Sequence, residues 1–216
     1  MAKNPNPQGK GLVPILAEWD AITPRLVRVK SAPQIMGEYF TSLLVLSAKF
    51  GFKPVPGKSY YLYWKKPSAK NTVNPLHKIE QPTALQQSPW RLSLIEPERL
   101  GTLAMGDFVG SCILQSDMTW TIEPSASIAE QTEALEDLRL FHQQFHDNNN
   151  HQQSLEASLP FFIDELPFYR RLAATALSSS LSRSIEISQL ENIPASQWLE
   201  SNNDTGMALL QNKSKP

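Results

Sequence analysis

Apolar positions along this chain follow two periods, and the change between them separates helical segments from β-strands. Apolar residues recur at helical spacing between Pro33 and Phe50. Pro33 suits a first helical turn, because the backbone N–H that proline lacks has no partner there, and Gly51 suits the end of a helix. The pattern therefore predicts an amphipathic helix over residues 33–50.

Between Tyr60 and Pro124 the period changes to two, and aromatic and β-branched residues accumulate. This alternation is typical of strands that bury one face. The predicted strands cover residues 60–64, 90–95, 108–114 and 118–122. The polar stretch Lys66–Pro89, which contains four prolines, is predicted to be a mobile loop.

After Pro124 the helical period returns and predicts a helix of about five turns, followed by the polar linker Asp147–Gln153. Pro160 and Pro167 are predicted to begin further helices. The sequence therefore predicts an α+β fold: a small four-stranded antiparallel sheet, arranged as a meander and packed by an N-terminal helix and C-terminal helices.

The same pattern predicts three regions along the chain. Residues 1–124 are expected to form an α+β domain with an N-terminal arm, a helix, and a sheet that carries the loop 66–89. Residues 125–200 are expected to form a C-terminal helical region. Residues 201–216 contain little apolar surface to offset the entropy of ordering, so they are predicted to be a disordered tail.

Composition excludes several classes of protein. Of 216 residues, 41% are hydrophobic, which is enough for a core of ordinary size. Lys and Arg number 20 against 21 Asp and Glu, so the chain lacks the basic field typical of nucleic-acid binders. The single cysteine, Cys112, excludes an internal disulfide framework, and the apolar run Leu43–Leu46 is too short to cross a bilayer. We therefore expect a cytoplasmic protein that does not contact a membrane.

Fragments of the β segment occur in the order found in a known family. They are Tyr60-Tyr61-Leu62-Tyr63, Leu92-Ser93-Leu94-Ile95 with Pro97, Phe108-Val109-Gly110, and Asp117, Thr119 and Trp120. Over residues 58–124 the chain resembles the bacterial branch of the family catalogued as domain of unknown function 2452. It departs from the family pattern in the long insert 66–89 and in Leu100, where the family has tryptophan. Because that family has no established activity, the resemblance implies a fold and no reaction.

Three motifs resemble parts of catalytic or metal-binding sites, and each lacks a feature that such a site requires. The stretch Gly51–Ser59 has the wrong spacing for a P-loop and runs from a predicted helix into a strand. His142 and His146 lie one helical turn apart, with His151 beyond them, but Gln follows His142 where a zinc protease has Glu. Cys112 lies inside a strand and is predicted to pack as a small hydrophobe. We therefore predict no cofactor and no metal, and we identify no catalytic residue.

The first strand is aromatic on both faces, which distinguishes it from its neighbours. The neighbouring strands each have one apolar face, formed by Trp90, Leu92 and Leu94 and by Met118, Trp120 and Ile122. Tyr61 and Tyr63 point away from that shared face. Either a helix of the same chain covers them, or they form with Lys65 an exposed recognition surface for a protein or an RNA.

We predict from these features a non-enzymatic protein-interaction module with an unknown protein partner. The alternatives are an RNA-binding module that uses an aromatic and basic sheet face, and an enzyme of unknown reaction. The balanced charge makes nucleic acid the less favoured partner. A concave pocket with convergent polar groups would favour the enzyme, whereas an exposed apolar patch would favour the interaction module.

Overall fold

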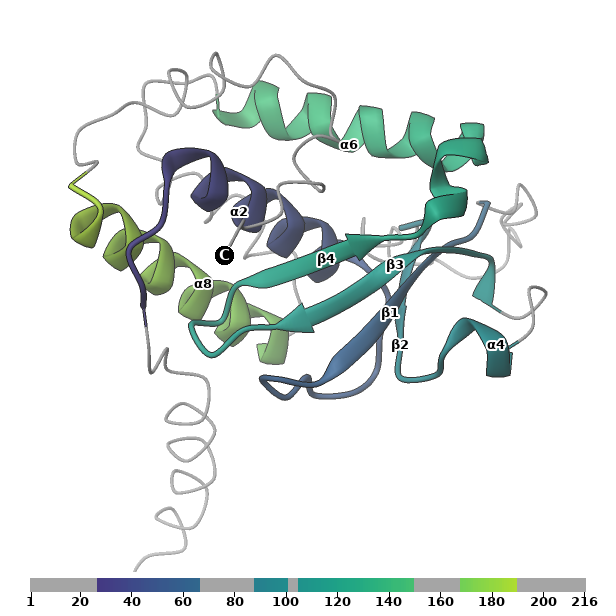
Figure 1. The fold of residues 1–216 in the computed structure, drawn as a ribbon, viewed down its shortest axis with the longest axis horizontal. Helices are drawn as coiled ribbons and strands as arrows, with labels where there is room; N and C mark the ends of the chain where they lie inside the picture. Colours follow the sequence, from purple (N-terminus) through teal and green to yellow (C-terminus); the bar gives the residue numbers. More distant parts are fainter. Residues whose placement is uncertain (1–26, 67–87, 101–104, 150–167, 190–216) are drawn as a thin grey trace, which may run out of the picture.

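The computed structural model describes residues 27–66, 88–100, 105–149 and 168–189, and it confirms an α+β fold (Figure 1). The elements in chain order are α2 (Ala32–Ser47), β1 (Ser59–Trp64), β2 (Trp90–Ser93), α4 (Pro97–Leu100), β3 (Asp107–Leu114), β4 (Trp120–Pro124), the 3-10 helix η1 (Ala126–Glu130), α6 (Thr132–Asn149) and α8 (Phe168–Ile187). Among the described residues, no helix is both long enough and apolar enough to span a membrane.

The four strands form one antiparallel sheet, as predicted, but the predicted meander is wrong. The strand order is β2-β1-β3-β4, so β1 pairs with both β2 and β3. A meander would place β2 beside β3 instead. The central position gives β1, whose side chains are large and mostly buried, a neighbouring strand on each side.

Helix α2 begins as the sequence predicts but ends earlier. The Ser31 hydroxyl caps its first turn by accepting from the Gln34 N–H at 3.4 Å. The predicted end at Phe50 is wrong, because the backbone of Lys49 is bonded to β2. The Lys49 N–H donates to the Trp90 carbonyl at 2.8 Å, and the Lys49 carbonyl accepts from the Leu92 N–H at 3.0 Å. These bonds draw the chain out of the helix and cover the free edge of β2.

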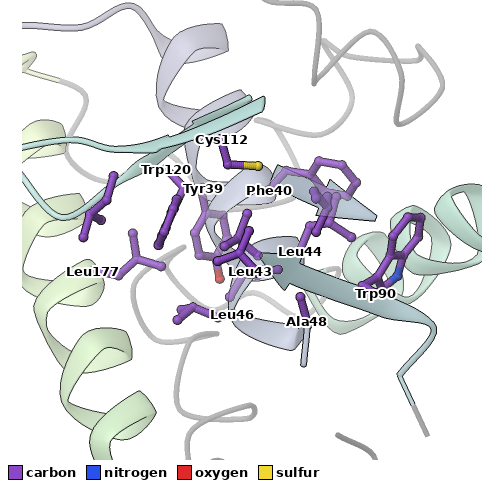
Figure 2. Close-up of a cluster of buried hydrophobic side chains, with 14 of the residues drawn as sticks. Tyr39, Phe40, Leu43, Leu44, Leu46, Ala48, Trp90, Cys112, Trp120 and Leu177 are labelled. Atoms are coloured by element: carbon purple, nitrogen blue, oxygen red, sulfur yellow. The ribbon is translucent and has the colours of Figure 1, made fainter. Parts of the chain in front are cut away.

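The core lies between α2 and one face of the sheet. Buried side chains from α2 meet Trp90, Cys112 and Trp120 from the strands, with Leu177 of α8 nearby (Figure 2). Helices α6 and α8 lie on either side of α2 (Figure 1). The Trp64 indole N–H donates to the Asp137 carboxylate at 2.6 Å, which fixes α6 to β1. One buried cluster therefore includes residues from both sides of the predicted boundary at 124/125.

A buried charge cluster joins three segments that are distant in sequence. The Lys30 ammonium contacts both Glu38 of α2 and Asp117 of the β3–β4 turn. The Lys30 backbone N–H also donates to the Ser188 hydroxyl, just after α8, at 3.2 Å. The Asp117 carboxylate accepts from the Thr119 hydroxyl at 2.6 Å. The chain entering α2 is thereby attached to the sheet and to α8.

Two further boundaries differ from the sequence prediction. Strand β2 ends at Ser93 rather than at residue 95, and Leu94 is 58% exposed instead of buried. Helix α6 continues to Asn149, so the first residues of the predicted linker are helical. The N-terminal arm, nearly all of the loop 66–89, the predicted helix start at Pro160 and the predicted tail 201–216 lie outside the described residues.

Candidate recognition surface

Strand β1 divides its side chains between the core and the opposite face of the sheet, here called the outer face. Tyr60, Leu62 and Trp64 are buried toward α2, whereas Tyr61 and Tyr63 lie on the outer face. The chain alternates as the sequence predicts. The two tyrosines nevertheless differ in environment.

A β-bulge determines which side chain of β3 lies beside Tyr63 on the outer face. Leu62 pairs with Gly110, but the next residue, Tyr63, pairs with Phe108, which leaves Val109 as the extra residue on β3. Phe108 therefore joins Tyr61 and Tyr63 on the outer face, with ring centroids 6.3 Å and 5.6 Å away respectively. Gly110 is required at the bulge, because a Cβ there would collide with the backbone of β4.

Tyr63 is buried, although the sequence offered it as part of an exposed surface. It is 3% exposed, and its hydroxyl donates to the Ile95 carbonyl at 2.9 Å. The corner that follows β2 thus folds over the outer face and covers this ring. The covering element is a short turn and not one of the long helices, which lie on the other face (Figure 1).

Tyr61 remains partly exposed beside this corner, and so does Phe108. The Tyr61 hydroxyl donates to the Glu96 carboxylate at 3.0 Å. Lys65, the third predicted residue, follows directly after β1 and is partly buried, with its backbone N–H donating to the Pro89 carbonyl at 2.9 Å. The aromatic surface available to a partner therefore consists of Tyr61 and Phe108. The buried ring of Tyr63 packs against Phe108.

Negative charge surrounds the two tyrosine hydroxyls. Burial first, and then the hydrogen bond to Glu96, raise the pKa of Tyr61. Burial first, followed by the charges of Glu98, Tyr61 and Glu96, raise the pKa of Tyr63 to about 12. Glu96 and Glu98 are exposed, so they form what we call the acidic end of the outer face.

Positive charge lies across the pairing of β1 with β2. Arg91 of β2 is opposite Tyr63, and an isolated parallel bridge places Lys49 beside Arg91. Burial, and then the charge of Arg91, lower the pKa of Lys49. The Arg91 Nε atom is buried without a hydrogen-bond partner. Lys49 and Arg91 form what we call the basic cluster.

Tyr63 should be the last of these hydroxyls to ionise on alkaline titration. Its pKa of about 12 predicts a tyrosinate absorbance step about two pH units above the ordinary tyrosine value of 10.0. The Tyr63→Phe variant should lose this step, and the Tyr61→Phe variant should keep it. In urea the step should move to the ordinary range, because burial no longer disfavours the charged form. Persistence of the step in Tyr63→Phe would contradict the assignment.

The candidate catalytic and metal-binding residues that the structure describes, Cys112 and His142, pack against other side chains. Cys112 is 0% exposed, which confirms its predicted packing role. The His142 ring meets the edge of Phe40 at 5.6 Å, and the side chains of His146 and His151 lie outside the described residues. Within the described ranges, no three His, Cys, Asp or Glu side chains are grouped to hold a metal ion.

Burial raises the pKa of the Cys112 thiol, so the native protein should resist thiol reagents. We expect disulfide-exchange labelling to be at least about a hundredfold slower in buffer than in urea, because labelling requires the core to open. Rates measured with a chromogenic disulfide reagent test this. Equal rates in the two conditions would show that the thiol is accessible in the native state.

Comparison with known proteins provides no external assignment. A scan against family models, a search of curated proteins and a search of solved structures each found no match to this chain. The resemblance to domain of unknown function 2452 therefore stays a prediction. The sequence reading did not place Phe108, Arg91 and the two glutamates on this face, because their positions depend on the bulge and on the corner after β2.

Proposed function

We propose that this protein is a non-enzymatic protein-interaction module that binds a protein partner through the outer face of its sheet. One observation carries the proposal: a partly exposed aromatic pair, Tyr61 and Phe108, lies on a face of the sheet with acidic and basic residues near it. Exposed apolar side chains lie beside it on the corner after β2 and on β3. They are Leu94, Ile95 and Ile113, which are 58%, 49% and 37% exposed. Aromatic residues with an apolar and charged surround are typical of protein interfaces.

The two edges of the sheet are poorly suited to pairing with a partner strand, which favours the outer face. Lys49 already bonds to the free edge of β2. On β4 the Trp120 N–H donates to the Ser42 hydroxyl at 2.8 Å, and Pro124 has no N–H to offer. A partner that binds by side-chain contact with the face fits this arrangement better than one that adds a strand.

RNA binding is the second candidate, and the charges near the aromatic pair count against it. A phosphate backbone that follows Tyr61 would meet Glu96 and Glu98, and the buried Tyr63 ring has no free face for a base. The described candidate nucleophile, Cys112, is buried away from solvent, which gives no support to the enzyme alternative. We place the module in the cytoplasm, without a cofactor or metal, on the composition of the chain.

The Tyr61→Ser variant tests the proposal, because Tyr61 is partly exposed and Tyr63 is not. We expect its free energy of unfolding to fall by about 1 kcal/mol or less, while recovery of the partner by affinity purification is lost. Each purification is run with and without nuclease, followed by mass spectrometry. A partner that is recovered by the tagged protein only without nuclease would favour RNA instead.

Val55→Ser is the matched control. Val55 is 45% exposed, and its backbone contacts the Tyr60 hydroxyl, which belongs to the core face. The control should keep both stability and partner. A folded Tyr61→Ser protein that recovers every partner of the wild type would refute the outer face as the binding surface.

A further inference from the structure

Arg91 of β2 has a guanidinium group without an acceptor among the described residues. Its Nε atom is buried and has no hydrogen-bond partner, although the residue is partly exposed. None of the ion pairs of the described residues joins Arg91 to a carboxylate. Because water cannot reach Nε, this guanidinium is less well hydrated than one in free solution. It therefore gains more from a charged acceptor that another molecule brings to its exposed part.

The backbone around Arg91 is held on both sides. Trp90 and Leu92, its neighbours in β2, are buried in the core at 3% and 2% exposed, so the Arg91 side chain lies on the outer face. Strand β2 pairs with β1 on one side, and on the other side the backbone of Lys49 bonds to Trp90 and Leu92. The base of the Arg91 side chain is therefore fixed before a partner arrives, which lowers the entropy cost of binding.

Arg91 lies in one row with two aromatic side chains of the outer face. It is paired with Tyr63 of β1, and Tyr63 is paired with Phe108 of β3. Neighbouring strands are about 4.8 Å apart, so the backbones at Arg91 and Phe108 are separated by roughly 10 Å. Two side chains of one short extended segment can span this distance, because residues i and i+2 lie on the same face about 7 Å apart. Arginine and aromatic residues are typical of the positions that dominate binding energy in protein interfaces.

We propose that Arg91 binds a carboxylate of the protein partner, from an Asp or Glu side chain, while an apolar side chain of the same partner segment packs on Tyr61 and Phe108. The guanidinium is planar and offers parallel N–H donors, which match the two oxygens of a carboxylate. This inference rests on the proposed function, because it names the chemistry by which the same surface recognises its partner.

A single carboxylate fits this face better than a chain of phosphates. Besides burial, the charges of Glu96 and Glu98 raise the pKa values of both Tyr61 and Tyr63, so these carboxylates act on the aromatic part of the face. An RNA backbone that reached Arg91 would bring several negative charges near the two glutamates. A protein segment can place one carboxylate on Arg91 and neutral or basic side chains elsewhere. RNA binding is therefore the outcome that the test must exclude.

Two capped tripeptides that differ in one functional group test the proposal on the whole chain. They are acetyl-Phe-Ala-Glu-amide, which carries one carboxylate, and acetyl-Phe-Ala-Gln-amide, which carries none. The NMR signal of the Arg91 Nε–H, which burial protects from exchange with water, reports binding and is assigned by its loss in Arg91→Gln. The Glu peptide should shift this signal and approach saturation by about 20 mM, and the Gln peptide should bind at least about tenfold more weakly.

Arg139→Gln is the matched control, because Arg139 belongs to an exposed pair with Glu136 on α6, on the helical side of the sheet (Figure 1). It should bind the Glu peptide as the wild type does, when binding is followed through the backbone amide signals of β1. Arg91→Gln should bind it at least about tenfold more weakly, and Arg91→Lys, which keeps the charge without the planar donors, should lie between the two. Thermal melts confirm that each variant folds, and Arg91→Lys replaces Arg91→Gln if that variant does not.

Equal affinities for the two peptides, no saturation by the Glu peptide, or an unchanged affinity in the Arg91 variant overturns the proposal. Inorganic phosphate that shifts the Arg91 signal at an about tenfold lower concentration than the Glu peptide overturns it in favour of RNA. In affinity purification, Arg91→Gln should lose the partner that Tyr61→Ser loses. A partner that is lost through Tyr61→Ser but kept by Arg91→Gln overturns carboxylate recognition alone and leaves the proposed function standing.

Discussion

Replacing Lys30 by methionine should lower the free energy of unfolding by about 3–5 kcal/mol, because it leaves two buried carboxylates without their cation. Lys30 contacts Glu38 and Asp117, and the three side chains are 9%, 12% and 7% exposed. The hydrogen bonds that these carboxylates accept from Gln34 and Thr119 remain, but they supply no positive charge. Urea denaturation followed by circular dichroism measures the change.

Lys66→Met is the matched control for this prediction. The Lys66 ammonium lies 2.5 Å from Glu133, but the two side chains are 70% and 55% exposed. Water screens such a pair, so its loss should change the free energy of unfolding by no more than about 1 kcal/mol. A Lys30→Met protein as stable as the Lys66→Met protein would mean that the cluster does not hold the segments together.

The same cluster predicts the sign of a pH effect. Burial alone lowers the pKa of Lys30, but the charge of Glu38 and the hydrogen bond to Asp117 outweigh it, so the net pKa lies above the ordinary lysine value of 10.5. As pH rises past that value, the unfolded chain loses this proton before the folded chain does. The stabilisation is therefore present below pH 10.5 and declines above it. Lys30→Met should lack this part of the alkaline decline.

Gly106→Ala should destabilise the protein by about 3 kcal/mol or more, since it combines backbone strain with steric overlap. Gly106 has a φ of +102°, a conformation that residues with a side chain rarely adopt. A Cβ at this position would overlap the Trp64 carbonyl, which is backbone and has no rotamer by which to move away. Urea denaturation, or a loss of soluble protein, reports the effect.

Substitutions at two other glycines distinguish the effect of backbone strain from that of steric overlap. Gly57 has a φ of +79° but open space around its Cβ position, so Gly57→Ala should cost only the strain, about 1–2 kcal/mol. Gly51 has open space and no positive φ, so Gly51→Ala should be neutral or stabilising by up to about 1 kcal/mol. Equal effects at Gly106 and Gly57 would show that the close approach to Trp64 is unimportant.

The existence and type of most elements followed from the sequence alone. Helical spacing after Pro33 and alternation in the β segment are set by backbone geometry, which needs no distant contact. For the same reason the alternation in β1 correctly placed Tyr61 and Tyr63 on the face opposite the core. The burial of Cys112 followed from its place in an apolar strand.

Tertiary structure decided where those elements end and what meets on the outer face. Lys49 leaves the helical pattern because β2, some forty residues later, binds its backbone. The central position of β1 depends on pairing with β3, and the bulge in that pairing brings Phe108 to Tyr61. Neither spacing nor propensity within one segment contains these contacts, since each depends on two segments folding against each other. The sequence therefore determined the faces of β1, and long-range pairing determined which of its tyrosines is buried and which charges lie around them.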